Sequence, residues 1–403
     1  MKRPSLTRLV KTYPKRLSLV VFIVAFLVIG SLLLLTSHAA TPAISAEAES
    51  GTLAGGASTV TDPSASGGKG VVFGAGSGST AGMITAGDSK ANCITIANGT
   101  DGDESPTNVS AAESVTGLTY NCLETFANPA PTWADWEAPW QFSNDASWSN
   151  WLAASPTHQM ILGVDLVPQA APGSSNGSSS DPLEWEEACD AGDYNSYATQ
   201  LASYLVAHNG GSVVIRLGIE ANGSWEADYT GSTTTELSDW ASCYDNEVTA
   251  MRAVSGAHFL FVWNPNICTQ DFSLDEWYPG NSYVDIIGAD AYDSDCHYET
   301  LTTVSEEGWQ AYYTDSASFP DAGFPSLSNI EAFAVTNNKP MSFPEWGLTA
   351  TTPDDSTYVT DMGQMFNSDD FAFQSYFDDG DDGIAQLGPT IPNSTAAYKQ
   401  EFK

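Results

Sequence analysis

Short apolar runs recur at intervals from about residue 90 to the end of the chain. Eight of them have the length and the partly β-branched composition of buried strands. The pattern therefore predicts eight strands. They are residues 93–97, 118–126, 160–167, 213–220, 258–264, 284–291, 340–345 and 371–377.

Amphipathic stretches lie between most of these runs. In residues 194–211 the apolar side chains follow helical spacing, with Tyr197, Leu201 and Leu205 on one face, and the pattern stops at two glycines. Residues 236–254 show the same spacing. Strands that alternate with helices over this length predict a (β/α)8 TIM barrel. A doubly wound open sheet is the alternative, but no glycine-rich phosphate turn follows the first strand.

The start of the chain has a different composition. Six of the 13 Lys and Arg residues lie within the first 16 positions, and residues 17–35 are almost entirely apolar. This predicts a signal peptide over residues 1–40, or a membrane anchor through residues 17–35 if the segment is not cleaved. Either way the remainder is expected outside the membrane, secreted or on the cell surface. Residues 41–82 are a Gly/Ser/Ala-rich spacer, and residues 83–403 are the barrel.

The strong excess of acidic residues limits the kinds of molecule that the protein can bind. Beyond the basic head, seven Lys and Arg residues remain against 50 Asp and Glu. Nucleic acid is excluded as a partner, because phosphate binding needs a basic surface. Neutral polymers such as polysaccharides are compatible with this charge, and a monomer is expected.

The cysteines indicate disulfides rather than a metal site. Their number is six, and an even count in an exported chain favours pairing. No CxxC pair or HExxH helix is present, so neither a metal nor a cofactor is predicted. Neighbours in sequence order are the favoured pairs, among the fifteen possible. They are Cys93–Cys122, Cys189–Cys243 and Cys268–Cys296.

The strand ends are where a barrel of this kind carries its chemistry. Acids and aromatic side chains gather there, as a glycoside hydrolase requires. The polar strand-end residues are Asp165, Glu220, Asn264, Asp290, Tyr292 and Glu345, and the aromatic neighbours are Trp225, Trp263, Trp346 and Tyr376.

Glu220 and Glu345 end the fourth and seventh predicted strands, so they should face each other across the barrel mouth. Retaining glycosidases use two carboxyl groups about 5–5.5 Å apart, one as acid/base and one as nucleophile. Each glutamate alone has a structural alternative. Glu220 could form a salt bridge with Arg216, and Glu345 could cap the following turn.

Four segments resemble glycoside hydrolase family 26. "RLGIEANGSW" is similar to the acid/base segment of that family, which commonly reads R-P-L-H-E-M-N-G. "FVWNPN", "WYPGNSYVDIIGADAY" and "KPMSFPEWG" match further segments in the same order, so the resemblance spans roughly residues 90–403. Family members are mostly endo-acting β-mannanases, with some xylan- and glucan-active relatives. Ile219 replaces the family histidine before the acid/base, and Leu217-Gly218 replaces Pro-Leu.

The resemblance assigns roles to individual residues. It implies that Glu220 is the acid/base, that Glu345 is the nucleophile and that Tyr292 orients Glu345. Arg216 and Asn222 are assigned to substrate binding, and they are also expected to support the pair by hydrogen bonds. Asp290 is either a sugar ligand or a structural cap. Trp225, Trp263 and Trp346 are candidates for stacking on sugar rings. For three tryptophans earlier in the chain, packing in the core is the alternative to stacking on sugar. They are Trp133, Trp136 and Trp140.

Residues 46–74 resemble the opening of carbohydrate-binding modules of families 6 and 35. In those modules the paired glutamates, here Glu47 and Glu49, often help to hold calcium. The segment is too short for a module, so it is interpreted as a truncated remnant or spacer without assigned ligand binding.

The predicted function is an exported, retaining, endo-acting β-glycoside hydrolase, with a mannan-type polysaccharide as its first candidate substrate. The alternative is a non-catalytic carbohydrate-binding or adhesion protein on a hydrolase scaffold. A serine hydrolase is disfavoured, because no G-x-S-x-G segment is present.

Overall fold

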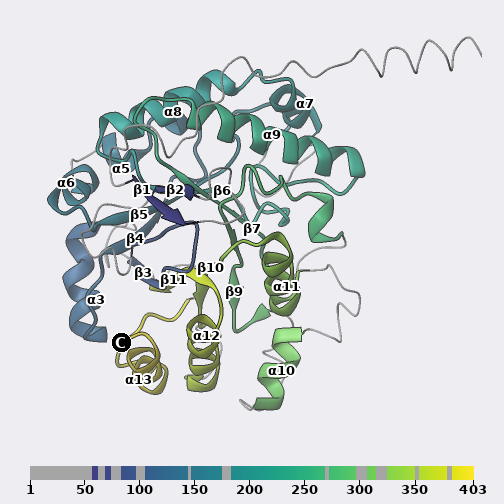
Figure 1. Cartoon of the computed structure of the whole chain (residues 1–403). Coiled ribbons are helices and arrows are strands. Elements are labelled where there is room, and N and C mark those ends of the chain that lie inside the picture. The colour runs from purple at the N-terminus through teal and green to yellow at the C-terminus, as the bar shows by residue number, and fades with distance from the viewer. Residues whose placement is uncertain are drawn as a thin grey trace, which may run out of the picture. The chain divides into compact units, whose positions relative to one another are not determined.

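Eight parallel strands pair in a closed ring in the computed structural model (Figure 1). Each strand pairs with the next along the chain, and the last pairs with the first. The predicted (β/α)8 barrel is therefore confirmed. Its strands are β3 (Ala91–Ile96), β4 (Cys122–Phe126), β5 (Gln159–Val164), β6 (Val214–Ile219), β7 (Leu260–Asn264), β8 (Ile286–Gly288) continued by β9 (Ala291–Tyr292), β10 (Met341–Gly347) and β11 (Phe371–Asp378).

The chain divides into two units, residues 1–79 and 80–403, and the barrel is the second. The structure describes residues 57–61, 69–73, 83–96, 105–143, 147–174, 183–267, 272–295, 306–314, 325–349, 354–378 and 384–403.

The sixth barrel strand is interrupted. Both β8 and β9 pair with β10, and Asp290 lies in the break between them. A bridge between Asn266 and Asp290 holds the break against the end of the fifth strand. Asp290 and Tyr292 both lie at this end of the sixth strand.

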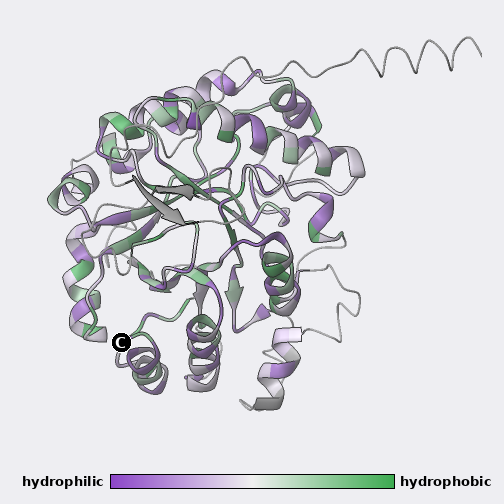
Figure 2. Ribbon diagram, viewed as in Figure 1, coloured by the Kyte–Doolittle hydropathy of each residue, from purple (hydrophilic) through white to green (hydrophobic). Residues whose placement is uncertain are grey.

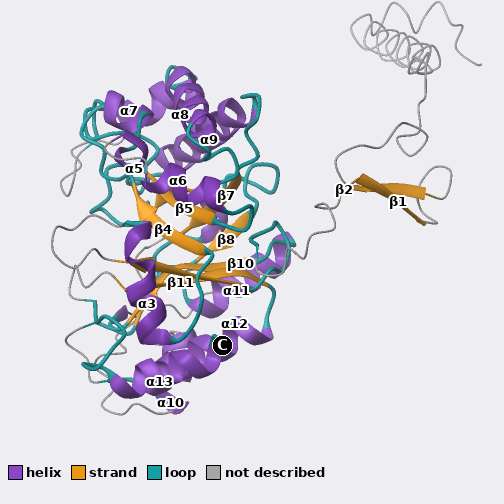
Figure 3. Cartoon of the chain, turned by 90° about the vertical axis from the view of Figure 1, so that its left-hand side faces the viewer, coloured by secondary structure: helices purple, strands orange, loops and turns teal. Residues whose placement is uncertain are grey.

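Helices surround the ring of strands (Figure 3), and both predicted helical stretches are confirmed as α8 and α9. The outer helices contain both hydrophilic and hydrophobic residues (Figure 2), as expected for helices that have one face on a sheet and the other in solvent. They are α3 (Val109–Thr116), α4 (Trp133–Glu137), α5 (Trp140–Ser143), α6 (Ser147–Ala154), α7 (Leu183–Asp190), α8 (Asn195–Ala207), α9 (Thr234–Arg252), α10 (Glu306–Thr314), α11 (Leu327–Asn337), α12 (Ser356–Ser368) and α13 (Pro392–Glu401), with 3₁₀ turns at η3 (Pro106–Asn108) and η4 (Leu274–Glu276).

Two sets of apolar side chains form the core of the barrel unit. The larger set joins the helices to the strands and contains most of the tryptophans, including Trp136. The smaller set comes mainly from the strands and includes Val214, Val262 and Phe373, together with Ile84 before β3. Burial of this much aromatic surface explains the high tryptophan content without recourse to ligand binding.

Two of the three predicted disulfides are confirmed. Cys93–Cys122 joins β3 to β4, and Cys189–Cys243 joins α7 to α9. The third predicted pair lies outside the described residues. Both bridges connect segments that the barrel already brings together, so they reinforce the tertiary contacts.

We expect almost no free thiol when the denatured, unreduced protein is titrated with a thiol reagent. The reason is that four of the six cysteines are bridged in the structure and the other two are predicted to pair. Reduction before titration is the positive control and should release all six thiols. Six free thiols without reduction would contradict both the bridges and the expected oxidising location.

The first unit contains a short antiparallel hairpin, β1 (Ala57–Thr61) with β2 (Lys69–Phe73). The predicted signal or anchor segment lies outside the described residues. Among the helices that the structure describes, none is both long and apolar enough to span a bilayer.

Candidate active site

An unusual backbone turn aims Glu220 at the barrel mouth. Gly218 has φ +72° and Glu220 has φ +44°, a left-handed conformation that non-glycine residues rarely adopt. The pairing of β6 with β7 shifts register at this point, between Arg216 and Ile219. A Cβ atom on Gly218 would lie 2.5 Å from Cζ2 of Trp240, so this position needs glycine. Such strain is typical of functional sites.

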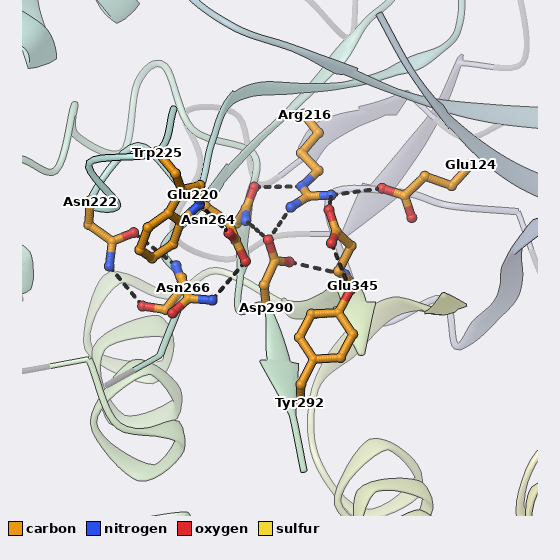
Figure 4. Close-up of polar contacts among 10 residues, drawn as sticks. All are labelled: Glu124, Arg216, Glu220, Asn222, Trp225, Asn264, Asn266, Asp290, Tyr292 and Glu345. Atoms are coloured by element: carbon orange, nitrogen blue, oxygen red, sulfur yellow. Dashed lines mark hydrogen bonds and ion pairs between the residues drawn. The ribbon is translucent and has the colours of Figure 1, made fainter. Parts of the chain in front are cut away.

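Glu220 accepts two hydrogen bonds from neighbouring side chains (Figure 4). Asn266 Nδ2 donates to Oε1 at 2.7 Å, and Trp225 Nε1 donates to Oε2 at 2.9 Å. Burial raises the pKa of Glu220, and the charge of Glu345 raises it further. The group is thus biased towards the protonated form that a general acid requires.

Asn222 holds the backbone of Asn266, the residue that donates to Glu220. Its side chain donates to the backbone carbonyl of Asn266 at 2.8 Å and accepts from the Asn266 backbone N–H at 2.9 Å. Asn222 is itself buried. Its polar atoms therefore hold the Asn266 segment rather than bind substrate, which corrects its predicted assignment.

Glu345 lies in β10, and its carboxylate has two donors. Tyr292 donates from its hydroxyl to Oε2 at 2.8 Å, and Arg216 forms an ion pair with Oε1. The Glu345 backbone N–H donates to Asp290 at 3.0 Å. The side chain keeps 13% of its surface exposed, so a ligand at the mouth can reach it.

Arg216 is fully buried and forms ion pairs with three carboxylates, Glu124, Asp290 and Glu345. Its Nε also donates to Asn264 at 2.8 Å. The prediction that Arg216 binds substrate is wrong, because no part of it reaches the surface; it positions Glu345. The structural alternative for Asp290 holds for the same reason, since this carboxylate is fully buried.

The two glutamates come together as predicted from the strand order. Carboxylate oxygens of Glu220, Asp290 and Glu345 all lie within 4.8 Å of one another. Asp290 is buried, so Glu220 and Glu345 are the members of this group that remain accessible from the mouth. The alternative salt bridge between Glu220 and Arg216 is absent from the ion pairs of the described residues.

Only one of the three predicted stacking tryptophans is accessible. Trp225 is 43% exposed beside Glu220, whereas Trp263 and Trp346 are fully buried in the core. Trp263 packs on Trp277, and Trp346 donates to Gln374. The prediction for Trp263 and Trp346 is wrong because successive side chains of a strand point to opposite faces. Each lies next to a mouth residue and therefore faces the helices.

Two site residues were not predicted from the sequence. Asn266 lies in the "FVWNPN" segment, so the motif signalled its neighbourhood but not its contact with Glu220. Glu124 is the one acid within β4, and a charged residue inside a strand with a buried pattern was the available signal. Burial raises the pKa of Glu124 to about 8, although the charge of Arg216 opposes this.

Comparison with known proteins finds a match within the barrel unit. Residues 183–315 match the model of Glycosyl hydrolase family 26, a segment that contains Glu220 and ends before Glu345. Comparison with curated proteins gave no significant match. The resemblance of residues 46–74 to carbohydrate-binding modules receives no support from these findings.

Several solved structures share the barrel. A Cellulomonas fimi endo-β-1,4-mannanase double mutant is 16% identical with a TM-score of 0.55, covering 80% of this chain and 71% of that one. A GH26 β-mannanase from Bacteroides ovatus is 12% identical with a TM-score of 0.52, covering 80% and 88%. The Bacillus subtilis mannanase BCman is 19% identical with a TM-score of 0.50, covering 78% and 85%.

At these identities the structural likeness shows the (β/α)8 fold. The fold and the site define a barrel with a pair of accessible glutamates at its mouth. The family match over the strand that leads to Glu220 supports a glycoside hydrolase.

Proposed function

We propose that this protein is an exported, retaining β-glycoside hydrolase of family 26 that cleaves within a β-linked polysaccharide. The observation that carries the proposal is the approach of Glu220 and Glu345, whose carboxylate oxygens lie within 4.8 Å of each other. This spacing suits direct attack by one carboxylate, whereas an inverting pair stands farther apart to admit a water molecule.

The proposed first step forms a glycosyl-enzyme. A carboxylate oxygen of Glu345 attacks the anomeric carbon while the glycosidic C–O bond breaks, and Glu220 gives its proton to the departing oxygen. Tyr292 and Arg216 hold Glu345 in place for this attack. The raised pKa of Glu220 keeps its proton available.

The second step releases the sugar. Glu345 is neutral in the ester, so it no longer raises the pKa of Glu220, and Glu220 can accept a proton from water. The water oxygen bonds to the anomeric carbon, and Glu345 leaves as a carboxylate. Two displacements at one carbon return the starting configuration.

A mannan-type polymer is the first candidate substrate. The family match and the three mannanases of similar fold support this choice. Trp225 offers an exposed indole beside Glu220 on which a sugar ring can stack. Ile219 departs from the family histidine and cannot hydrogen-bond a sugar, so the contacts at this position differ from those of the family.

We expect clear release of reducing sugar from plain mannan and little from polymers rich in uronic acid. The reason is that the barrel unit has few cations with which to bind an anionic chain, and Arg216 is buried. A panel of mannan, xylan, mixed-linked glucan and a polyuronate tests this. Preference for the polyuronate would refute the substrate class. Binding to a polymer with no hydrolysis of any would favour the non-catalytic alternative.

A further inference from the structure

A second group of carboxylates lies beside the active site and has no role in the proposed reaction. This acidic cluster consists of Asp165, directly after β5, and of Glu226 and Asp228 in the loop between β6 and α9. One carboxylate oxygen from each residue lies within 4.8 Å of the other two. Asp165 is 1% exposed and Asp228 is fully buried.

The carboxylates of the cluster are poorly compensated. Apart from a side-chain contact of Asp165 with Asn128, neither oxygen of Asp165 has a hydrogen-bond partner in the described part of the chain, and neither does Oδ1 of Asp228. The other Asp228 oxygen accepts from the Leu166 N–H at 2.8 Å. Asp165 therefore directs a buried carboxylate, with no more than a neutral amide beside it, into a group of two further acids, which is strongly unfavourable without a positive charge.

No side-chain cation supplies that charge. All six Lys and Arg residues of the barrel unit lie in the described part of the chain, and none forms an ion pair with the cluster. Arg216, the buried one, is already paired with three other carboxylates. The compensating charge must come from bound protons or from a metal ion.

The geometry distinguishes these possibilities. Calcium binds oxygen at about 2.3–2.6 Å, so ligands of one ion stand at most about 5 Å apart, as the three oxygens do. Three hard oxygen donors without histidine or thiolate favour calcium over zinc or copper. In the absence of an ion, burial raises the pKa of Asp228 to about 7, and burial together with the charges of nearby acids, Asp165 first, raises that of Glu226 to about 10. The cluster would then hold protons that an ion displaces.

We propose that Asp165, Glu226 and Asp228 bind a divalent cation, calcium, which links the end of β5 to the loop that follows Glu220. Trp225 precedes Glu226 in this loop and donates to Glu220. The ion would therefore fix the segment that carries the exposed tryptophan. Sequence motifs predicted no metal, because these ligands come from two separate segments and form no recognised loop pattern. The proposal does not depend on the hydrolase function.

The test uses the full chain after chelation and dialysis, with calcium added back. We expect one saturable site by calorimetry on the barrel. We also expect a rise in melting temperature of about 5 °C when calcium reaches roughly a hundred times its dissociation constant. Terbium is a second probe. The Trp136 indole donates to the Asp165 backbone carbonyl at 2.8 Å, so it lies close enough to a terbium ion in the cluster to sensitise the luminescence of that ion.

The variants Asp165→Asn and Asp228→Asn should lose both the thermal shift and the terbium signal. Their chelated forms should melt no lower than the chelated wild type, because each substitution removes repulsion. Glu226→Gln, at a partly exposed position, provides the same test if the other two fail to fold. Asp361→Asn is the matched control, a buried carboxylate on α12 outside the cluster, and should keep the full calcium response.

Two results would overturn the proposal. One is the absence of any response of the wild type to calcium, magnesium or manganese at about 10 mM, above the range of weak extracellular sites. The other is a calcium response that is unchanged in Asp165→Asn and Asp228→Asn, as would follow from binding at Glu47 and Glu49 instead.

Discussion

Replacing Glu345 with alanine is expected to abolish formation of a glycosyl-enzyme on an aryl β-glycoside with a good leaving group, whereas Glu220→Ala should form that intermediate and accumulate it. Glu345 supplies the attacking oxygen, so nothing replaces it. Glu220 supplies a proton that a good leaving group hardly needs, but it is then missing as the base that activates water. Mass spectrometry of the intact protein detects the added sugar directly.

Azide separates the two roles further. It needs no general base, so it should accelerate turnover of Glu220→Ala and yield a β-glycosyl azide of retained configuration. On unactivated polymer, Glu220→Ala should lose about 10²–10⁴-fold in kcat/KM. Glu187→Ala, at an exposed acid on α7, is the control and should behave as the wild type. Near-normal polymer hydrolysis by Glu220→Ala, or a retained azide product from Glu345→Ala, would show that the assignment is wrong.

Replacing Arg216 with methionine should reduce the free energy of unfolding by about 3–5 kcal/mol, the range seen when one partner of a buried ion pair is removed. Arg216 is the shared partner of Glu124, Asp290 and Glu345, and the first two are fully buried. Without the guanidinium these acids must bind protons or admit water. Activity should also fall sharply, because Glu345 loses one of its donors.

The control for this prediction is Arg252→Met. Arg252 pairs with Asp285 at 2.8 Å, but the two side chains are 35% and 20% exposed. Pairs in water contribute less than about 1 kcal/mol, so the loss should be small. Arg216→Lys should lie between the two, since lysine keeps the charge but not the planar fork that reaches several carboxylates. Denaturant unfolding measures all three variants. Equal stability of Arg216→Met and wild type would contradict this prediction. It would show that the carboxyl groups around Arg216 bind protons at no cost once the arginine is removed.

The barrel was predictable because its signals are local. Each strand is buried on both faces, so runs such as 160–167 and 213–220 are mostly apolar, except for Asp165, Arg216 and Glu220, and stand out from the helical spacing between them. The order of those runs also placed Glu220 and Glu345 opposite each other, because parallel strands present their ends at one face. The break in the sixth strand was not predicted, since nothing in 284–291 other than the tertiary pairing divides it.

The direction of a side chain at the barrel mouth was much less predictable. Trp263 and Trp346 lie next to Asn264 and Glu345 in sequence, yet strand alternation turns both into the core. Trp225 lies in a loop, where alternation does not apply, and it is exposed. Proximity in sequence to a site residue thus predicted the neighbourhood of a side chain but not its direction.

The sequence by itself determined the class of fold and the two glutamates at the mouth, because periodicity, residue type and strand order are properties of the chain taken in order. It favoured the two disulfides that the structure contains, but it left fifteen pairings possible. Only the tertiary structure decided that Arg216 and Asn222 support the site rather than face substrate, and that Asp165 meets Glu226 and Asp228. Those outcomes depend on a register shift after β6 and on side chains from several strands meeting within hydrogen-bonding distance. Such contacts arise from long-range pairing, which a linear pattern of residues does not contain.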